Sequence, residues 1–194
     1  DPSLRRLCNQ LYAEVKSAPI ISPLGHTDPA WFADDMAFDN ALSLLVVPDH
    51  YVLRMLYSRG VAFEDLGVPD REGGVRVTPR EGWRRFAENY YLFAGTPSRL
   101  WLDTTFQTVF GLDIQLNADS ADHYFDHINE CLQQPEFRPR ALLDRFNVAY
   151  IATTEHALDP LTHHKKLVAD GMSSRVTTTF RPDDVLDPDF HNFG

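Results

Sequence analysis

The stretch NVAYIATTEHALDPLTHHKKLVADGMSSRVTTTFRPD, residues 147–183, decides the fold class of this sequence. It opens with a continuous apolar run that ends in small polar residues and an acid, a pattern typical of a buried parallel strand. Residues 159–171 then have the pattern of a helix, and Gly171 suits the C′ position at its end. A second strand follows within residues 174–183. Strand, helix and strand over roughly 35 residues predict a βαβ unit.

A further strand is expected near residues 19–24, in the stretch PIISPLGHTDP that covers residues 19–29. An amphipathic helix precedes it, because residues 3–17 place leucine and valine at helical spacing. In α/β barrels the active site lies at the carboxyl ends of the strands. Polar side chains follow all three expected strands: His26 and Asp28, Glu155 and His156, and Arg181 and Asp183. We therefore expect a functional site at these strand ends.

Between the first two strands lies a long segment, residues 31–145, whose apolar residues recur with the 3.6-residue period of helices. Turn signals rich in proline and glycine interrupt this segment. The sequence therefore predicts an α/β protein in three parts. Residues 1–30 hold an N-terminal helix and the first strand, residues 31–145 form a helical insertion, and residues 146–194 form the βαβ portion.

The composition is that of a globular protein, since 43% of the 194 residues are hydrophobic and 12% are aromatic. A formal net charge of −10 argues against nucleic-acid and anionic-membrane partners, because phosphate neutralisation needs clustered lysine and arginine. No apolar run approaches the ~20 residues that cross a bilayer, and no signal peptide is visible. Cys8 and Cys131 indicate neither a disulfide framework nor a cysteine zinc site. We expect a cytoplasmic protein, and the ends of the sequence suggest a truncated chain.

Four segments together resemble the first part of the uronate isomerase (glucuronate isomerase) family, which belongs to the amidohydrolase superfamily. They are PIISPLGHTDPAWF at 19–32, PDHYVLRMLYSRGV at 48–61, FRPRALLDRFNVAYIATTEHALDPLTHHKKL at 137–167 and TTTFRPD at 177–183. The resemblance covers nearly the whole chain, in order. It implies a (β/α)8 TIM barrel with a large helical insertion after the first strand, of which this chain would hold the N-terminal part.

The resemblance also implies an aldose–ketose isomerase, which is an intramolecular oxidoreductase. Such an enzyme interconverts D-glucuronate with D-fructuronate, and D-galacturonate with D-tagaturonate, by proton transfer. In the family a divalent metal, usually zinc, is held by a His-x-His motif after the first strand and an aspartate after the eighth. His26 matches the second histidine of that motif, whereas Leu24 occupies the place of the first and is not a ligand. Because leucine has no lone pair to donate, we expect weak or absent metal binding in this chain.

Four further residues match segments of the family. The resemblance implies that Tyr51 is catalytic and relays a proton near the sugar. It implies that His50, Arg54 and Arg181 bind the substrate, and a guanidinium can hold a carboxylate in a bidentate fork. Two histidine pairs have a weaker pattern: His123 with His127, which is more often a polar helix face than a metal clip, and His163 with His164, which diverge by about 100° around a helix.

These residues also have structural interpretations, which stay open. Asp49 can cap a helix whose first turn holds Tyr51 partly in the core. His26 can be a turn histidine hydrogen-bonded near Asp28, and Arg181 can pair with an aspartate at 183 or 184.

The expected function is that of a uronate isomerase with a sugar-acid substrate, and the sequence leaves a homo-oligomer open. Only about three of the eight barrel strands fit within this length, so the chain alone is expected to be inactive. One alternative is a metal-dependent hydrolase of the amidohydrolase type. The other is a non-catalytic remnant that binds sugar acids, for which Leu24 is the evidence.

Overall fold

The computed structural model describes residues 1–182 and residue 186. Asp183 and Asp184, which the sequence places after the third strand, lie outside the described residues. The chain divides into two units. The first combines residues 1–36 with the residues from 138 onward, and the second spans residues 37–137.

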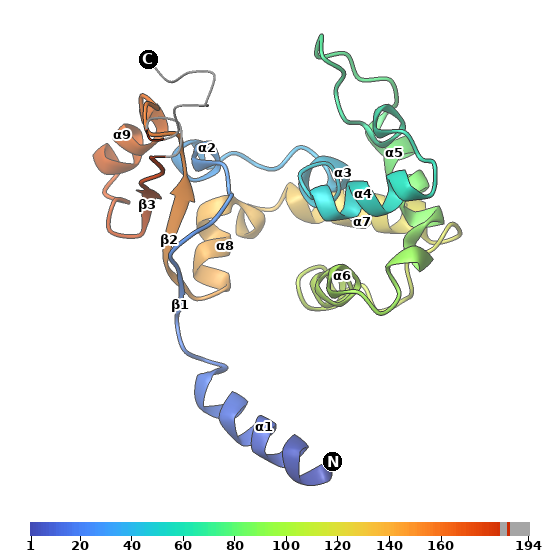
Figure 1. Ribbon diagram of the computed structural model, residues 1–194, viewed down its shortest axis with the longest axis horizontal. Coiled ribbons are helices and arrows are strands. Elements are labelled where there is room, and N and C mark those ends of the chain that lie inside the picture. The colour runs from blue at the N-terminus through green and yellow to red at the C-terminus, as the bar shows by residue number, and fades with distance from the viewer. Residues whose placement is uncertain (183–185, 187–194) are drawn as a thin grey trace. The chain divides into compact units, whose positions relative to one another are not determined.

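A parallel sheet lies at the centre of the first unit. Its strands are β1 (Ile20–Ser22), β2 (Val148–Thr154) and β3 (Val176–Thr179), and β2 lies between the other two (Figure 1). Ile151 in β2 is the register partner of Ser22 on one side and of Val176 on the other. The predicted βαβ unit and the parallel pairing of all three strands are therefore confirmed.

Four helices belong to the same unit: α1 (Pro2–Val15), α2 (Pro29–Asp34), α8 (Pro139–Arg145) and α9 (Thr162–Ala169). Helices α2, α8 and α9 share one apolar core with β2 and β3, built from Phe32, Ala33, Leu143, Ile151, Leu167 and Val176. Side chains alternate between the two faces of a strand, so the face of β2 that carries Ile151 is the face toward these helices. The helix expected over residues 3–17 is confirmed as α1, and none of its residues is buried.

Strand β1 ends at Ser22, short of the expected residue 24. The reason is Pro23, which has no N–H to donate to the sheet. Leu24 and His26 therefore lie in the irregular segment after β1 and not on the strand itself. This segment stays beside β2, because the Gly25 N–H donates to the Ala152 carbonyl at 2.7 Å. A Cβ at position 25 would lie 3.3 Å from that carbonyl oxygen, so the close approach favours glycine.

The second unit is helical, as the period of its apolar residues predicts. Its α-helices are α3 (Ala41–Leu45), α4 (His50–Ser58), α5 (Pro79–Glu88), α6 (Pro97–Thr108) and α7 (Ala121–Leu132). Short 3₁₀ turns join them: η1 (Phe63–Leu66), η2 (Tyr90–Phe93) and η3 (Pro135–Phe137). Local sequence determines where α5 begins, because Thr78 and Glu81 form a reciprocal capping box at its N-terminus.

Aromatic side chains fill the core of the second unit. Trp83 is fully buried, meets the edge of the Phe106 ring at 6.2 Å between centroids, and donates its indole N–H to the Ala121 carbonyl at 2.9 Å. This one residue thus ties α5 to both α6 and α7, and its polar atom is satisfied as a buried indole requires. Within residues 1–182 and 186, no helix is both long and apolar enough to span a bilayer.

Candidate functional site

The carboxyl ends of the three strands meet at one edge of the sheet, where the sequence predicts a site. Threonine hydroxyls tie these ends together. Thr154 Oγ1 donates to the Gly25 carbonyl, and Thr179 Oγ1 donates to the Pro23 carbonyl at 3.1 Å. Because β2 lies between β1 and β3, the second bond shows that the segment after β1 bends toward β3 at this edge.

His26, the candidate metal ligand, is exposed in that segment, and the side chain of Leu24 is exposed near it in sequence. Asp28 is committed to the N-cap of α2, because its Oδ1 accepts the Ala30 N–H at 2.8 Å. Among the residues that the structure describes, no group of three or more His, Cys, Asp and Glu side chains could hold a metal ion. The donors present at this edge therefore do not fit the metal site that the resemblance implies.

The second strand ends in Glu155 and His156, and these two residues differ sharply in exposure. His156 is exposed, whereas the Glu155 side chain is only 9% exposed and lies 3.7 Å from the His164 Nε2 atom of α9. His163 and His164 diverge around α9 as expected, and only His164 is buried. The contact of Glu155 with His164 was not predicted, because nothing in the sequence says which face of α9 packs on β2. Arg181 is exposed and follows β3 after one intervening residue.

The candidate residues His50, Tyr51 and Arg54 belong to the first turns of α4. Asp49 caps this helix, accepting the N–H groups of Tyr51 at 2.8 Å and Val52 at 3.2 Å, so the prediction of an N-capped helix is confirmed. The expectation that Tyr51 is partly in the core is wrong, because it is 64% exposed.

The rings of His50 and Tyr51 lie 4.2 Å apart between centroids, and the Arg54 guanidinium carbon lies 5.6 Å from the Tyr51 ring centroid. An aromatic ring face attracts a cation at this distance. The three side chains therefore form one exposed group with a phenol, an imidazole and a guanidinium.

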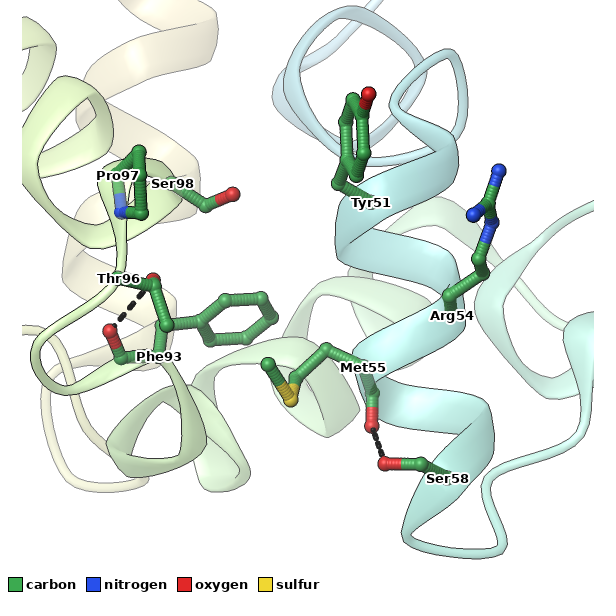
Figure 2. Close-up of a pocket in the computed structure, with 8 residues that line it drawn as sticks. All are labelled: Tyr51, Arg54, Met55, Ser58, Phe93, Thr96, Pro97 and Ser98. Atoms are coloured by element: carbon green, nitrogen blue, oxygen red, sulfur yellow. Dashed lines mark hydrogen bonds between the residues drawn. The ribbon is translucent and has the colours of Figure 1, made fainter.

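A pocket of about 400 Å³ lies beside this group, lined by Tyr51, Arg54, Met55, Ser58, Phe93, Thr96, Pro97 and Ser98. Figure 2 shows the Met55 and Phe93 side chains pointing toward each other across it. The Ser58 and Thr96 hydroxyls donate to the Met55 and Phe93 carbonyls at 2.7 Å each, so both are already engaged. The lining thus combines the apolar Met55 and Phe93 with Tyr51, Ser98 and Arg54, whose guanidinium points away from Met55 and Phe93 (Figure 2).

A second pocket of the same unit, about 290 Å³ in volume, is lined by Arg99, Asp103 and Tyr124 among others. Asp103 accepts the Tyr90 hydroxyl at 2.9 Å and the Arg99 Nε–H at 2.6 Å. Burial, and then the bond to Asp103, raise the pKa of Tyr90 well above its usual value, and burial raises the pKa of Tyr124 to about 12. Both phenols therefore stay protonated at neutral pH and act as structural donors.

The other predicted histidine pair also has a structural role. The rings of His123 and His127 on α7 stack at 6.2 Å between centroids, and His127 Nε2 lies 2.8 Å from the Phe110 carbonyl oxygen. The two histidines thus lie on one face of α7, as their spacing of four residues predicts.

The candidate residues are thus divided between the two units. Leu24, His26 and Arg181 belong to the sheet unit, and His50, Tyr51 and Arg54 share one helix of the helical unit.

Comparison with known proteins extends these observations. The sequence matches the family model for glucuronate isomerase over residues 4–194. The whole chain aligns at 58% identity with a uronate isomerase of Rhizorhabdus wittichii, covering 40% of that protein, and at 55% with one of Xanthomonas campestris, covering 41%. The chain therefore spans about two fifths of the length of these curated relatives.

Solved structures of glucuronate and uronate isomerases also resemble this chain. The crystal structure of glucuronate isomerase from Caulobacter crescentus matches 96% of this chain and 39% of its own, with a TM-score of 0.93 and 50% identity. That of uronate isomerase from Thermotoga maritima covers 90% of this chain and 37% of its own at a TM-score of 0.78, and with 24% identity it supports the fold alone. The predicted resemblance is confirmed, and the chain belongs to the glucuronate isomerase family.

Proposed function

We propose that the protein to which this chain belongs is an aldose–ketose isomerase of uronates. Its substrates are D-glucuronate and D-galacturonate, which it interconverts with D-fructuronate and D-tagaturonate. The observation that carries the proposal is the 58% identity, over the full length of this chain, to a protein named uronate isomerase.

The reaction moves a proton between adjacent carbons through an enediol. Tyr51 is the proposed catalytic residue, because it is exposed, lines a pocket and has a phenol that can relay that proton. His50 and Arg54 surround the Tyr51 ring and are the proposed substrate-binding groups on α4.

Arg181 is the proposed partner of the uronate carboxylate. Its planar guanidinium matches a carboxylate with two parallel hydrogen bonds, and it is exposed beyond the carboxyl end of β3. Arg181 thus lies at the carboxyl ends of the strands, which is where parallel α/β folds bind their ligands.

His26 is the proposed remnant of a metal site. A divalent metal would polarise an oxygen at the reacting end of the sugar. Because Leu24 stands where the first histidine of the motif is expected, the donor set does not fit such an ion, and no step of this proposal is assigned to the metal.

A second candidate function is a non-catalytic sugar-acid-binding protein, and Leu24 is the observation that favours it. Loss of a metal ligand would remove turnover while leaving Arg181 and the α4 group able to bind a uronate. The two candidates differ in whether product forms.

A coupled assay separates them by following reduction of the ketose product with NADH. The 194-residue chain alone is expected to give no turnover, with or without Leu24→His. In a polypeptide that extends this chain to the length of its relatives, Leu24→His should raise zinc occupancy and turnover. Normal turnover by the unextended chain would contradict the expectation that this chain alone is inactive. Zinc-loaded Leu24→His protein that binds uronate without forming ketose would contradict the isomerase proposal.

Two substitutions test the residues in that extended, zinc-loaded protein. Tyr51→Phe and Arg181→Met should each lower turnover, about a hundredfold for a lost proton relay. Tyr57→Phe is the matched control, because Tyr57 is an exposed phenol on the same helix that does not line the pocket. Equal turnover of Tyr51→Phe and Tyr57→Phe would remove Tyr51 from the mechanism.

A further inference from the structure

Glu155 is a buried carboxylate that the proposed reaction does not use. It follows β2 directly, and its Oε2 atom accepts the Thr178 hydroxyl from β3. His164 of α9, whose side chain is 10% exposed, places Nε2 3.7 Å from the same oxygen. Burying a carboxylate is costly unless hydrogen bonds or charges compensate it, so its position calls for an explanation.

The hydrogen bonds of Thr153, next to this carboxylate, determine which ring nitrogen of His164 carries a proton. Thr153 donates its one hydroxyl proton to the Thr177 carbonyl at 3.1 Å. Its oxygen must therefore accept at the other contact, which is His164 Nε2 at 2.9 Å. Nε2 thus carries a proton, and His164 acts as a donor toward β2.

The face of the sheet decides what kind of role Glu155 can have. Ile151, Thr153 and Glu155 alternate along β2, and Ile151 packs in the core against the helices. The contacts of Glu155 with Thr178 and His164 place it on that same helix-covered face. A group on this helix-covered face does not contact a ligand bound at the carboxyl ends of the strands. Glu155 can therefore affect a site at these strand ends only through other residues.

The residue through which it acts is Thr178. Thr178 lies opposite Thr153 in the register of β2 and β3, one residue before the end of β3. Arg181 follows three positions after Thr178, and only Thr179, the register partner of Thr154, continues the strand between them. A bond at Thr178 is therefore among the last constraints on the direction in which the chain leaves the sheet toward Arg181.

We propose that Glu155 is a positioning residue for Arg181. By accepting the Thr178 hydroxyl it fixes the carboxyl end of β3, while His164 of α9 donates to Thr153 and lies 3.7 Å from the carboxylate. The role assigned to Arg181 rests on the proposed function, whereas the fixing of β3 does not.

Amide hydrogen exchange of the 194-residue chain tests the fixing of β3. Thr178→Val keeps the side-chain shape and loses the hydroxyl, and it should speed exchange of the Thr178 and Thr179 amides about tenfold, as expected for one lost buried hydrogen bond. Thr178→Ser restores the hydroxyl and should stay within about twofold of the unmodified chain. Equal exchange in the valine and serine variants would overturn the proposal.

A second pair of variants tests Glu155 itself. Glu155→Gln keeps an oxygen that can accept the Thr178 hydroxyl and should leave β3 exchange within about twofold, while Glu155→Leu should match Thr178→Val. Long-range ¹H–¹⁵N spectra should show His164 protonated at Nε2 in the unmodified chain. A proton on Nδ1 alone would overturn the assignment of His164 as the donor.

Titration with D-glucuronate, followed at the Arg181 Nε–H resonance, connects the positioning to the site. Binding should weaken about tenfold in Thr178→Val and recover in Thr178→Ser, which a general loss of stability would not reproduce. If Arg181 does not respond to D-glucuronate in any protein, its role in the proposed function fails. The exchange data then still decide whether Glu155 fixes β3.

Discussion

Leu24 is the residue that bears most directly on metal chemistry in this chain. We predict that the unmodified chain retains less than one equivalent of zinc after dialysis, because no group of three or more His, Cys, Asp and Glu side chains among the described residues could hold a metal ion. Leu24→His should raise zinc affinity by about tenfold or more, since a second imidazole then faces the ion. Elemental analysis after dialysis measures the retained zinc, and isothermal titration calorimetry measures the zinc affinity. The double variant Leu24→His, His26→Ala is the control, and stoichiometric zinc at His26 in the unmodified chain would contradict the prediction.

Arg140 is the residue that most clearly holds the sheet unit together. Its Nε donates to the Phe32 carbonyl at 2.6 Å, and its Nη2 donates to the Ala33 carbonyl at 3.1 Å and to Asp170 at 2.6 Å. The two carbonyls are in the last turn of α2, where no intrahelical donor remains. We predict that Arg140→Met lowers the free energy of unfolding by about 2–4 kcal/mol in urea titrations. Arg138→Met, on an exposed neighbour, should change it by less than about 0.5 kcal/mol.

At the scale of elements, a charge network joins α5 to α7. Arg84 bonds Asp122 at 2.8 Å, and Arg80 bonds both Asp122, at 3.2 Å, and Asp126. The hydrogen bond from Arg84, followed by that from Arg80, holds the pKa of Asp122 below its usual value of 3.8, and the bond from Arg80 does the same for Asp126. The unfolded chain therefore takes up these protons at a higher pH than the folded chain does.

The pH dependence follows from that difference. The stabilisation is fully present above the ordinary pKa of 3.8 and is lost as pH falls below it, through the lowered pKa of the folded state. We predict that Asp122→Asn lowers the melting temperature at neutral pH and that its difference from the unmodified chain shrinks below pH 3.8. Thermal unfolding across a pH series measures it. Glu130→Gln, an exposed acid on the same helix, is the control and should show no such trend.

At the scale of the whole molecule, the two units have separate cores, one built around Ile151 and one around Trp83. We predict that they do not unfold as a single cooperative transition, because two-state behaviour needs one shared core. In the Trp31→Phe variant, fluorescence reports only Trp83 and Trp101 of the helical unit, while NMR intensities of β2 amides report the sheet unit. The two urea midpoints should differ. Coincident midpoints and slopes would show that the chain unfolds as one body.

The elements were predictable from the sequence to different degrees. The helical period of residues 31–145, the three strands and the Asp49 cap all follow from patterns among near neighbours, and each is present in the structure. The end of β1 was missed, although Pro23 was the signal that could have found it. The structural interpretation that placed Tyr51 partly in the core is wrong, because an aromatic residue in a first helical turn can face either way.

The sequence by itself determined the family, the parallel βαβ order and the candidate residues, because these depend on local period and on motifs that survive without knowledge of packing. Only the tertiary structure decided which side chains meet. Glu155 with His164, Thr179 with the Pro23 carbonyl, and Arg140 with the end of α2 join residues whose contact depends on which faces pack together. Burial strengthens the contact of Glu155 with His164, since loss of a partner there would leave a desolvated group that water cannot satisfy, whereas the bond of Thr179 to the Pro23 carbonyl is exposed.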